Sequence, residues 1–448
     1  MSMTRRRFMG AAPCVIALPV AAGLPASAFA QAALDASSMG LKPETPGAGA
    51  ALARLAGEAA RRGLPLFLAP GRYRVGPAQL PEGAALVGGA GLVRLVSDQP
   101  GPILTARGIR RLSLAGLTLE GAGGRSQAPP LIDLDDVASL SLVDCEILAS
   151  PSTGVKLNRC GGRVERCRIA GAADAGLFSM DGQRMLIRDN VVEGCGNNGV
   201  LVWRSQLGDD ATLVDDNRIS RIRTDAGGTG QNGNAIGLFR ASNVIVRGNV
   251  VRDCALSAVR NNGGAGVQMI GNTCVGLGET ALYQEFGFAG AVVAQNVVED
   301  ASTGISLTNL DQGGRGAACT GNVLRRIRRR PLPYGAEAGG GIAIHAEGDA
   351  AITGNVIEDV DRIAIRIGWG KFLRNVAVTG NSIRRSPVGI AVSVAEGAGP
   401  ALVGGNVLSE TREGAVVGFD HDRAVTGDLT KPGQKLWPGI RIEANAAS

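Results

Sequence analysis

Short runs in which aliphatic side chains alternate with small or polar ones recur from about residue 86 towards the C-terminus. Each run follows a small residue, as in Gly199-Val-Leu-Val202, Gly304-Ile-Ser-Leu307 and Gly341-Ile-Ala-Ile344. A period of two residues is typical of a β-strand, and no repeat contains an apolar pattern long enough for a helix. The pattern therefore predicts many very short strands separated by turns.

One asparagine recurs at the same place in successive repeats. The nine positions are Asn190, Asn217, Asn249, Asn272, Asn296, Asn322, Asn355, Asn381 and Asn406. Cys145 and Cys167 occupy the equivalent place in two earlier copies, so that one repeat takes 22 to 33 residues. A unit of this length with two or three short strands is one turn of a parallel β-helix, whose turns stack about 4.8 Å apart. The sequence therefore predicts an all-β chain of about 11 or 12 such turns.

The repeated asparagines have a structural interpretation. In a turn, an asparagine side chain bonds to nearby backbone groups, and stacked asparagines bond to one another. We therefore expect an amide ladder along one edge of the coil rather than nine ligands.

The two ends of the repeat region are predicted to be covered, because an exposed sheet edge invites unwanted pairing. Residues 46–63 place Leu52, Leu55 and Ala59 on one face, which predicts a capping helix. We expect an N-terminal cap over residues 31–85, β-helix repeats over 86–429 and a C-terminal cap over 430–448.

The composition agrees with a coil that turns often around a narrow interior. Of 448 residues 67 are Gly, only 3% are aromatic and 45% are hydrophobic. The hydrophobic content excludes disorder, and the lack of a three-residue Gly period excludes collagen. Seven Cys follow residue 30, without a spacing that suits a metal. We expect them to fill the interior, and we predict no metal and no cofactor.

The first thirty residues have the features of an export signal. Arg5 and Arg6 precede Phe8, an apolar stretch covers residues 10–24, and Ala28-Phe-Ala30 forms a small-x-small cleavage site. The segment resembles a bacterial twin-arginine signal, which implies the twin-arginine translocase as an export partner and a periplasmic or secreted protein. No later run reaches 18 apolar residues, so no membrane span is expected.

Removal of the signal peptide lowers the formal net charge from +6 to +3, because the segment contains three Arg and no acidic residue. The remaining basic residues are interspersed with acidic ones. This pattern argues against a nucleic-acid partner, which requires basic side chains gathered on one face.

The N-terminal residues also resemble a known superfamily. The predicted helix followed by Gly63-Leu-Pro-Leu-Phe-Leu-Ala-Pro-Gly-Arg-Tyr73, and then Leu86-Val-Gly-Gly89, is similar to the opening of pectate-lyase-like proteins. With the signal and the Asn repeats, the chain resembles a bacterial family of twin-arginine-translocated repetitive proteins. The resemblance implies a right-handed, single-stranded parallel β-helix. It implies no single activity, because the superfamily contains lyases, glycosidases, epimerases, esterases and non-catalytic adhesins.

Two long turns suggest where a site lies. Most repeats have eight or nine residues between the Asn and the small residue, but Asn217 to Ala235 takes 18 and Asn322 to Gly341 takes 19. The extra residues, 222–234 and 328–340, fall in the same turn of repeats that are four apart, about 19 Å along the coil. We expect them to wall a cleft long enough for a short oligosaccharide.

Between these inserts, outward positions are rich in polar and aromatic side chains. We take Arg260, Tyr283, Glu285 and His345 as candidate catalytic residues: Arg could neutralise a uronate carboxylate, and Tyr or His could move a proton. Candidate substrate-binding residues are Trp203, Phe239, Arg240, Asn262, Asn309 and Arg366. A solvated outer β-face explains the same pattern equally well.

No known mechanism follows from these residues. The candidate face has Glu285 with at most Asp311 or Glu347, and so lacks the several Asp of a calcium-dependent pectate lyase. The paired Asp and the Arg-Ile-Lys of a polygalacturonase have only poor counterparts in Asn309-Leu-Asp311 and Arg366-Ile-Gly368, and His345 lacks flanking Gly. Glu285 and Glu347 would form a glycosidase pair only if the turns brought them together. Asp420-His421-Asp422 could bind a cation or decorate a turn.

Three functions remain open at this point. The protein could be an exported enzyme that modifies a polysaccharide by elimination or hydrolysis, with the four candidate residues in one cleft. It could instead be a non-catalytic scaffold that binds a glycan or the cell envelope, or a structural spacer.

Overall fold

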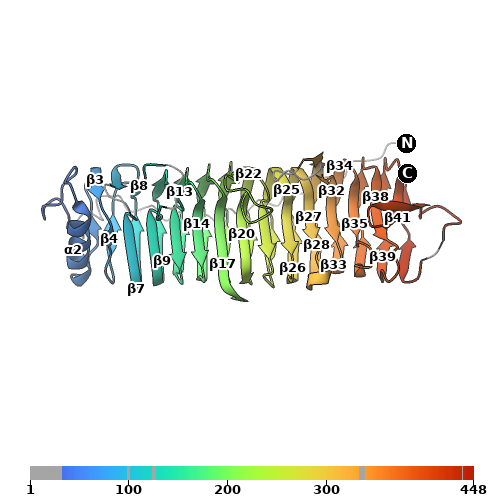
Figure 1. The fold of residues 1–448 in the computed structure, drawn as a ribbon, viewed down its shortest axis with the longest axis horizontal. Helices are drawn as coiled ribbons and strands as arrows, with labels where there is room; N and C mark the ends of the chain where they lie inside the picture. Colours follow the sequence, from blue (N-terminus) through green and yellow to red (C-terminus); the bar gives the residue numbers. More distant parts are fainter. Residues whose placement is uncertain (1–32, 98–100, 124–127, 332–338, 436) are drawn as a thin grey trace, which may run out of the picture.

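The computed structural model describes residues 33–97, 101–123, 128–331, 339–435 and 437–448. They form a right-handed parallel β-helix of about 13 turns, slightly more than the 11 or 12 expected. Figure 1 shows the long coil with the helix α2 (Ala48–Arg61) across its N-terminal end. Arg5 and Arg6 lie outside the described residues.

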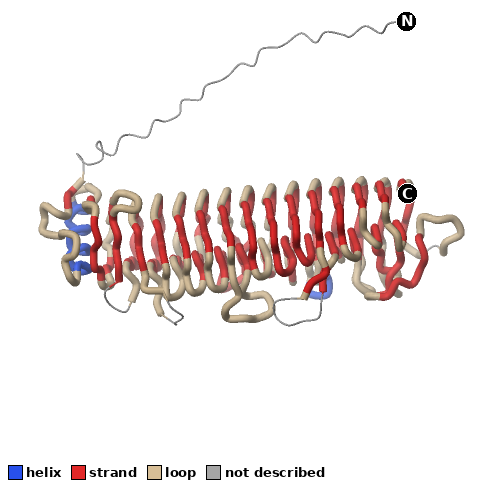
Figure 2. The backbone as a smooth tube through the Cα atoms, turned by 90° about the horizontal axis from the view of Figure 1, so that it is seen from above, coloured by secondary structure: helices blue, strands red, loops and turns tan. Residues whose placement is uncertain are grey.

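Three faces make up the coil, and each is a stack of parallel strands, drawn in red in Figure 2. Face 1 consists of β4 (Ala78–Gln79), β7 (Leu104–Ala115), β9 (Ile132–Val143), β11 (Val155–Asn158), β14 (Ala175–Met180), β17 (Asn198–Asp209), β20 (Asn234–Ser242), β23 (Val259–Asn262), β25 (Thr273–Glu285), β27 (Val297–Leu307), β32 (Ile342–Ala346), β35 (Ile363–Ile367), β38 (Val388–Ser393) and β41 (Gly414–Asp420).

Face 2 includes the C-terminal parts of β7 and β9. Its other strands are β1 (Leu34–Asp35), β2 (Leu66–Phe67), β5 (Ala85–Val87), β12 (Gly161–Glu165), β15 (Gln183–Arg188), β18 (Leu213–Asp215), β21 (Ile245–Arg247), β24 (Gln268–Ile270), β26 (Ala289–Ala294), β28 (Arg315–Thr320), β33 (Gly348–Thr353), β36 (Arg374–Thr379), β39 (Ala401–Gly404) and β43 (Ile440–Glu443).

Face 3 includes the N-terminal parts of β25 and β27. Its other strands are β3 (Gly71–Val75), β6 (Val93–Ser97), β8 (Thr118–Glu120), β10 (Glu146–Leu148), β13 (Arg168–Ala170), β16 (Val191–Glu193), β19 (Arg218–Ser220), β22 (Val250–Cys254), β29 (Val323–Ile327), β34 (Val356–Val360), β37 (Ser382–Arg384), β40 (Val407–Ser409) and β44 (Ala446–Ala447).

A close approach between neighbouring turns explains the small residue that recurs in the strands of face 1. A Cβ at Gly199 would lie 2.4 Å from the carbonyl oxygen of Ala235 in the next turn, and a Cβ at Gly304 would lie 2.4 Å from that of Ala343. Neighbouring turns therefore approach too closely there for a large side chain. Inside the coil, the inward side chains form one continuous aliphatic core.

The predicted asparagine ladder is confirmed. The backbone N–H and the side-chain amide of Asn296 both donate to Oδ1 of Asn322, at 3.0 and 2.9 Å. The same amide donates to the carbonyl oxygen of Met269 at 2.9 Å, and Oδ1 of Asn296 accepts two bonds from Asn272. The ladder ends at Asn445, a tenth member that the repeat analysis missed. The buried amides thus satisfy one another from turn to turn.

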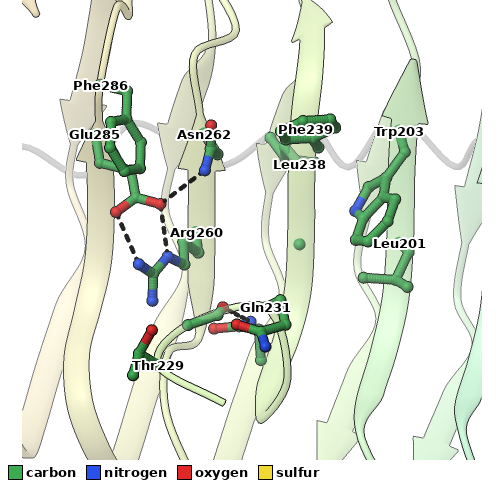
Figure 3. A pocket seen from close by; sticks show the side chains of 13 residues that line it. Leu201, Trp203, Thr229, Gln231, Leu238, Phe239, Arg260, Asn262, Glu285 and Phe286 are labelled. Carbon is green, nitrogen blue, oxygen red and sulfur yellow. Dashed lines mark hydrogen bonds and ion pairs between the residues drawn. The ribbon is translucent and has the colours of Figure 1, made fainter. Parts of the chain in front are cut away.

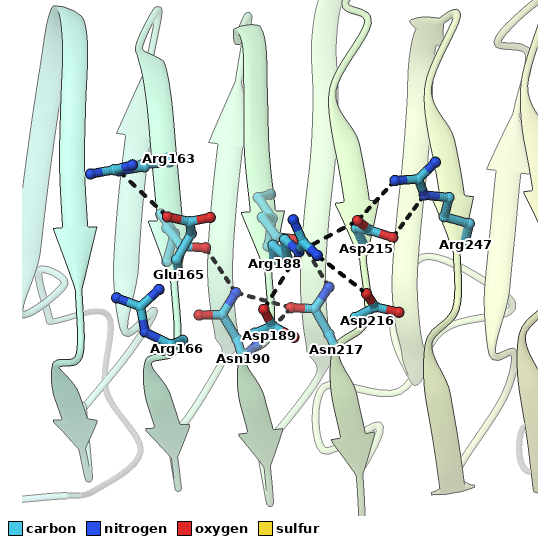
Figure 4. A network of polar contacts seen from close by, with 12 residues as sticks. Arg163, Glu165, Arg166, Arg188, Asp189, Asn190, Asp215, Asp216, Asn217 and Arg247 are labelled. Carbon is cyan, nitrogen blue, oxygen red and sulfur yellow. Dashed lines mark hydrogen bonds and ion pairs between the residues drawn. The ribbon is translucent and has the colours of Figure 1, made fainter. Parts of the chain in front are cut away.

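Charged side chains line the outside of the coil next to the ladder (Figure 4). Arg247 holds Asp215 through two hydrogen bonds of 2.8 and 3.1 Å, and Arg188 lies within 3.8 Å of Asp189, Asp215 and Asp216. Because most of these arginines are about half exposed, each pair adds little stability. This part of the surface is a solvated outer face.

The two ends of the coil differ. Helix α2 buries Leu52, Leu55, Ala56 and Ala59 against the first turn, as expected, and its bounds are two residues inside the predicted 46–63 at each end. At the C-terminus, β43 and β44 continue faces 2 and 3, while β42 (Arg423–Asp428) pairs antiparallel with β41. The segment from residue 430 therefore adds part of a further turn.

The seven cysteines after the signal region are all buried and free. Burial raises the pKa of the Cys195, Cys254 and Cys319 thiols to about 12, so they stay protonated at neutral pH. This agrees with their expected role as interior fillers. Within the described ranges, no helix is both long and apolar enough to cross a membrane.

The ladder leads to a prediction about stability. Asn296→Ala leaves the buried backbone N–H of Asn272 and the Met269 carbonyl without their side-chain partner. We expect the free energy of unfolding to fall by about 3 kcal/mol, because each buried polar group without a partner costs about 1–3 kcal/mol. Denaturant titration followed by circular dichroism measures this loss.

Asn445→Ala serves as the matched control, because Asn445 ends the ladder and is partly exposed to water. We expect a loss below about 1 kcal/mol for this variant. Equal losses at the two positions would show that the ladder is not what stabilises the stack.

Candidate functional site

A pocket of about 390 Å³ lies on the outer surface of face 1, between β17 and β25 (Figure 3). It lies beside the first of the two long turns. Its lining residues are Leu201, Trp203, Thr229, Gly230, Gln231, Asn234, Gly237, Leu238, Phe239, Arg260, Asn262, Glu285 and Phe286. Five of the ten candidate residues from the sequence therefore line one pocket: Trp203, Phe239, Arg260, Asn262 and Glu285.

The strand register explains why these residues meet. Trp203, Phe239, Asn262 and Glu285 occupy one column across four successive turns, because each is the register partner of the one before. Leu201, Gly237, Arg260 and Tyr283 form the column beside it. Side chains two residues apart on a strand share a face, so both columns point outward.

The long turn 222–234 forms one wall of the pocket. Its position is fixed by two hydrogen bonds, from the Asn234 amide to the Gly230 carbonyl at 2.9 Å and from the Asn198 amide to the Gln231 carbonyl at 3.1 Å. The turn packs directly on Arg260, since a Cβ at Gly230 would lie 2.2 Å from its Nη1 atom. The first insert therefore helps to build the pocket.

Arg260 is held by two carboxylates. Its Nε donates to Oε1 of Glu285 at 2.7 Å and its Nη2 to Oε2 at 2.8 Å, while Nη1 donates to Oε2 of Glu279 at 3.2 Å. The side chain of Arg260 is 12% exposed and that of Glu285 is 3% exposed. Two parallel N–H···O bonds are the strongest arrangement for such a pair, so the guanidinium is fixed in place.

Tyr283 lies next to this ion pair. The Arg260 guanidinium is 4.9 Å from the centre of its ring. Burial and the nearby Glu285 carboxylate raise the pKa of the Tyr283 phenol to about 12. At neutral pH the phenol therefore keeps its proton, so it can act as a general acid but not as a general base.

Three aromatic rings follow one another across the other side of the site. The centre of the Trp203 ring is 5.6 Å from that of Phe239 and 5.2 Å from that of Phe178. The Arg240 guanidinium lies 4.7 Å from the centre of the Phe239 ring, and its Nη1 donates to the carbonyl oxygen of Ser205 at 3.0 Å. Trp203 and Phe239 thus form an aromatic shelf beside the polar wall (Figure 3).

Asn262 and Asn309 have different places. The Asn262 amide lines the pocket and donates to Oε1 of Glu285 at 3.3 Å. Asn309 does not line it, but its Oδ1 accepts from the backbone N–H of Phe286 at 3.1 Å. Asn309 therefore positions Phe286, which closes one edge of the pocket.

His345 and Arg366 lie farther along face 1. In the column of Tyr283, Ser306 comes next, then His345 and then Arg366, so His345 is two turns from Tyr283, about 10 Å away. Arg366 is 3% exposed, bonds to Asp422 at 3.0 Å and stacks on Trp369 at 4.4 Å. The hairpin of β41 and β42 therefore engages Arg366 away from the pocket.

Glu285 and Glu347 do not form a compact pair. Glu347 is two turns beyond Glu285, and its Oε2 accepts the backbone N–H of Leu310 at 2.8 Å. Leu310 begins the short 3-10 helix η1 (Leu310–Gln312). In the second long turn, β30 (Arg329–Arg330) pairs antiparallel with β31 (Gly339–Gly340), and residues 332–338 lie outside the described part.

A second hollow of about 570 Å³ lies beside the first along face 1. The turn 222–234 contributes Asp225 and Ala226 to it, and Phe178 lines it as well. Lys156 and Phe178 belong to the same outward column as Leu201, Gly237 and Arg260. The two hollows therefore follow one another along the coil axis, linked by the aromatic rings.

Sequence reasoning missed several residues of the site. Thr229 and Gln231 fall inside the insert that the repeat lengths located, but nothing in the spacing indicates which insert residues face the pocket. Glu279 lies two residues before the small residue Ala281, and the equivalent position varies between repeats, with Asp174, Ser302 and Arg362 in three of them. Nothing in the repeat pattern therefore indicated Glu279.

Comparison with known proteins agrees with the fold. Residues 131–298 match the sequence family described as the right handed β-helix region. The match and the coil agree on a right-handed parallel β-helix. No curated protein sequence matches the chain.

Comparison with solved structures gives matches at low sequence identity. The pre-mature bacteriophage φ29 gene product 12 superposes with a TM-score of 0.63 at 15% identity, covering 88% of this chain and 58% of that chain. The catalytic unit of a GH87 α-1,3-glucanase from Streptomyces thermodiastaticus gives 0.46 at 15%, covering 96% and 70%. The lidless DFA-IIIase from Arthrobacter chlorophenolicus gives 0.47 at 13%, covering 79% and 94%. At such identities the likeness concerns the fold alone.

The half-buried side chain of His345 leads to a prediction about pH. Burial and the nearby Arg366 lower its pKa to about 3, whereas an unfolded histidine titrates near pH 6.5. Between these values only the unfolded chain binds the proton, so stability is lost as the pH falls from about 6.5 towards 3. At pH 5 the wild type should take up about one proton more on unfolding than His345→Gln.

Denaturant titrations of both proteins between pH 4 and pH 8 measure this difference. Other acidic and basic groups affect the two proteins alike, so they cancel in the comparison. Parallel curves over the whole range would contradict a neutral His345.

Proposed function

We propose that this protein is an exported glycan-binding protein that holds a polysaccharide along face 1. In this proposal one sugar ring stacks on the shelf of Trp203 and Phe239. Its hydroxyl groups bond to the polar wall formed by Gln231, Asn262 and Glu285.

The single observation that carries the proposal is an aromatic shelf beside a hydrogen-bonding wall in one pocket. A sugar ring has apolar C–H faces and polar edges, and ligand sites combine large apolar surfaces with a few placed polar groups in this way. The chain has only three Trp among 448 residues, so one of them on an outer β-face is unusual.

The arrangement of the two hollows supports a chain rather than a single sugar. From Lys156 to Tyr283 the outward column crosses five steps between turns, about 24 Å at the strand spacing. Both hollows share the wall 222–234. A polysaccharide that follows the coil axis would meet both of them.

Binding fits the polar groups better than bond cleavage does. Both oxygens of Glu285 are engaged by Arg260, which leaves no free carboxylate for a nucleophile or base. The phenol of Tyr283 stays protonated, and His345 and Glu347 are two turns away. A glycosidase needs two carboxyl groups on either side of the scissile bond.

Removal of the shelf tests the proposal. In Trp203→Ala, we expect affinity for a glycan bound by the wild type to fall at least about tenfold, because the sugar loses its stacking surface. A panel of neutral and acidic polysaccharides, followed by isothermal titration calorimetry with oligosaccharides of the polymer that binds, measures the change. No new reducing or unsaturated ends should appear.

Leu207→Ala is the control, because Leu207 is 62% exposed on β17 and does not line the pocket. It should leave the affinity unchanged. Product formation by the wild type would replace binding with catalysis as the function, and failure to bind any polymer of the panel would overturn the proposal.

Export can be tested separately. In a bacterial host, replacement of both Arg5 and Arg6 by Lys should keep the precursor inside the cell, because the signal depends on the arginine pair. Fractionation and immunoblotting of periplasm and cytoplasm detect the change. Equal periplasmic amounts of the variant and the wild type would rule out the twin-arginine route.

A further inference from the structure

Building on the proposed function, we infer that the glycan in this pocket is uncharged: neither a uronate nor a free amino sugar. Arg260 is the only cationic side chain among the described residues that line the pocket. Its charge is already balanced within the protein.

Three of the five N–H groups of Arg260 already donate to carboxylates of the protein. Its Nε and Nη2 face the two oxygens of Glu285, and its Nη1 faces Glu279. The three side chains are 12%, 3% and 11% exposed, so the ion pairs are largely shielded from water. One positive and two negative charges give this cluster a formal net charge of −1.

A uronate would therefore meet like charge. Its carboxylate would come close to Glu285, which lines the pocket, and in a shielded site such a contact is only weakly screened. To bind Arg260 it would have to displace a fixed, doubly bonded glutamate and leave that charge buried without a partner. A sugar hydroxyl has no such cost, since it can donate to the carboxylate and accept from the Asn262 amide.

A free amino sugar, which is positively charged, is also disfavoured. The position between the two glutamates is already taken by the Arg260 guanidinium. The Arg240 guanidinium lies 4.7 Å from the centre of the Phe239 ring, where an ammonium group would otherwise bind. An amino sugar therefore meets a like charge at both places that would attract it.

A matched pair of ligands tests the inference. The probes are a neutral oligosaccharide from the polymer that the wild type binds, and the same oligosaccharide after oxidation of its primary hydroxyls to carboxylates. We expect the oxidised form to bind at least about tenfold more weakly, which corresponds to about 1.4 kcal/mol. Polygalacturonate, alginate and chitosan should fail to bind.

The variant Glu279→Gln tests the cause. It removes one negative charge beside Arg260 and keeps the shape of the side chain, so the cluster becomes formally neutral. We expect the discrimination against the oxidised form to shrink at least about fivefold in this variant. Glu299→Gln is the control, because Glu299 pairs with Arg325 on face 3, outside the lining of the pocket.

The outcomes separate this inference from the proposed function. Equal or tighter binding of the oxidised form or of a uronate polymer by the wild type would overturn the inference and leave glycan binding intact. Tighter binding of chitosan than of every neutral polymer would overturn it as well. The absence of binding to any polymer would overturn the proposed function together with the inference.

Discussion

From Asn190 to Asn445, hydrogen bonds between stacked asparagine side chains fix each turn of the coil against the next, and the candidate site depends on that register. Each ladder amide bonds both to the following asparagine and to a backbone carbonyl of the preceding turn, as Asn296 does with Asn322 and Met269. The strand columns on face 1 inherit this alignment. The site exists because Arg260 and Glu285 come from adjacent turns in register, since residues far apart in the sequence become neighbours only through the stack.

The sequence was sufficient for the fold and for the place of the site. The Asn spacing gave the repeat, and the ladder, the capping helix and the buried cysteines follow from local chemistry. The two long intervals located the wall 222–234. The three-way contact of Arg260 with Glu285 and Glu279 could not be predicted, because a sequence lists charges without their partners. Alignment of the repeats on Gly341 puts His345 at the strand position of Glu285. In the register, His345 instead follows Ser306 in the column of Tyr283, two turns from that tyrosine.

Charge pairing also changes how the outward face is interpreted. An arginine next to a tyrosine and a glutamate suggests, from the residue types alone, a site for an acidic sugar. In the folded chain the Arg260 guanidinium forms ion pairs with Glu285 and Glu279 and orients these two carboxylates. The same side chains thus favour hydroxyl recognition. Next to the ladder, Arg247 is about half exposed where it pairs with the buried Asp215, so water screens this pair more than the one between Arg260 and Glu285.

The turn 222–234 leaves the coil after β19 and returns to it at β20 without disturbing the stack, since β19 pairs with β22 and β20 pairs with β23 without a shift of register. Recognition and architecture are therefore encoded in separate segments of the chain. A substitution or a change of length in this loop would reshape the walls of both hollows while the strands beneath kept their alignment. A lineage of such coils could acquire new ligand preferences by altering this one loop, at almost no risk to folding.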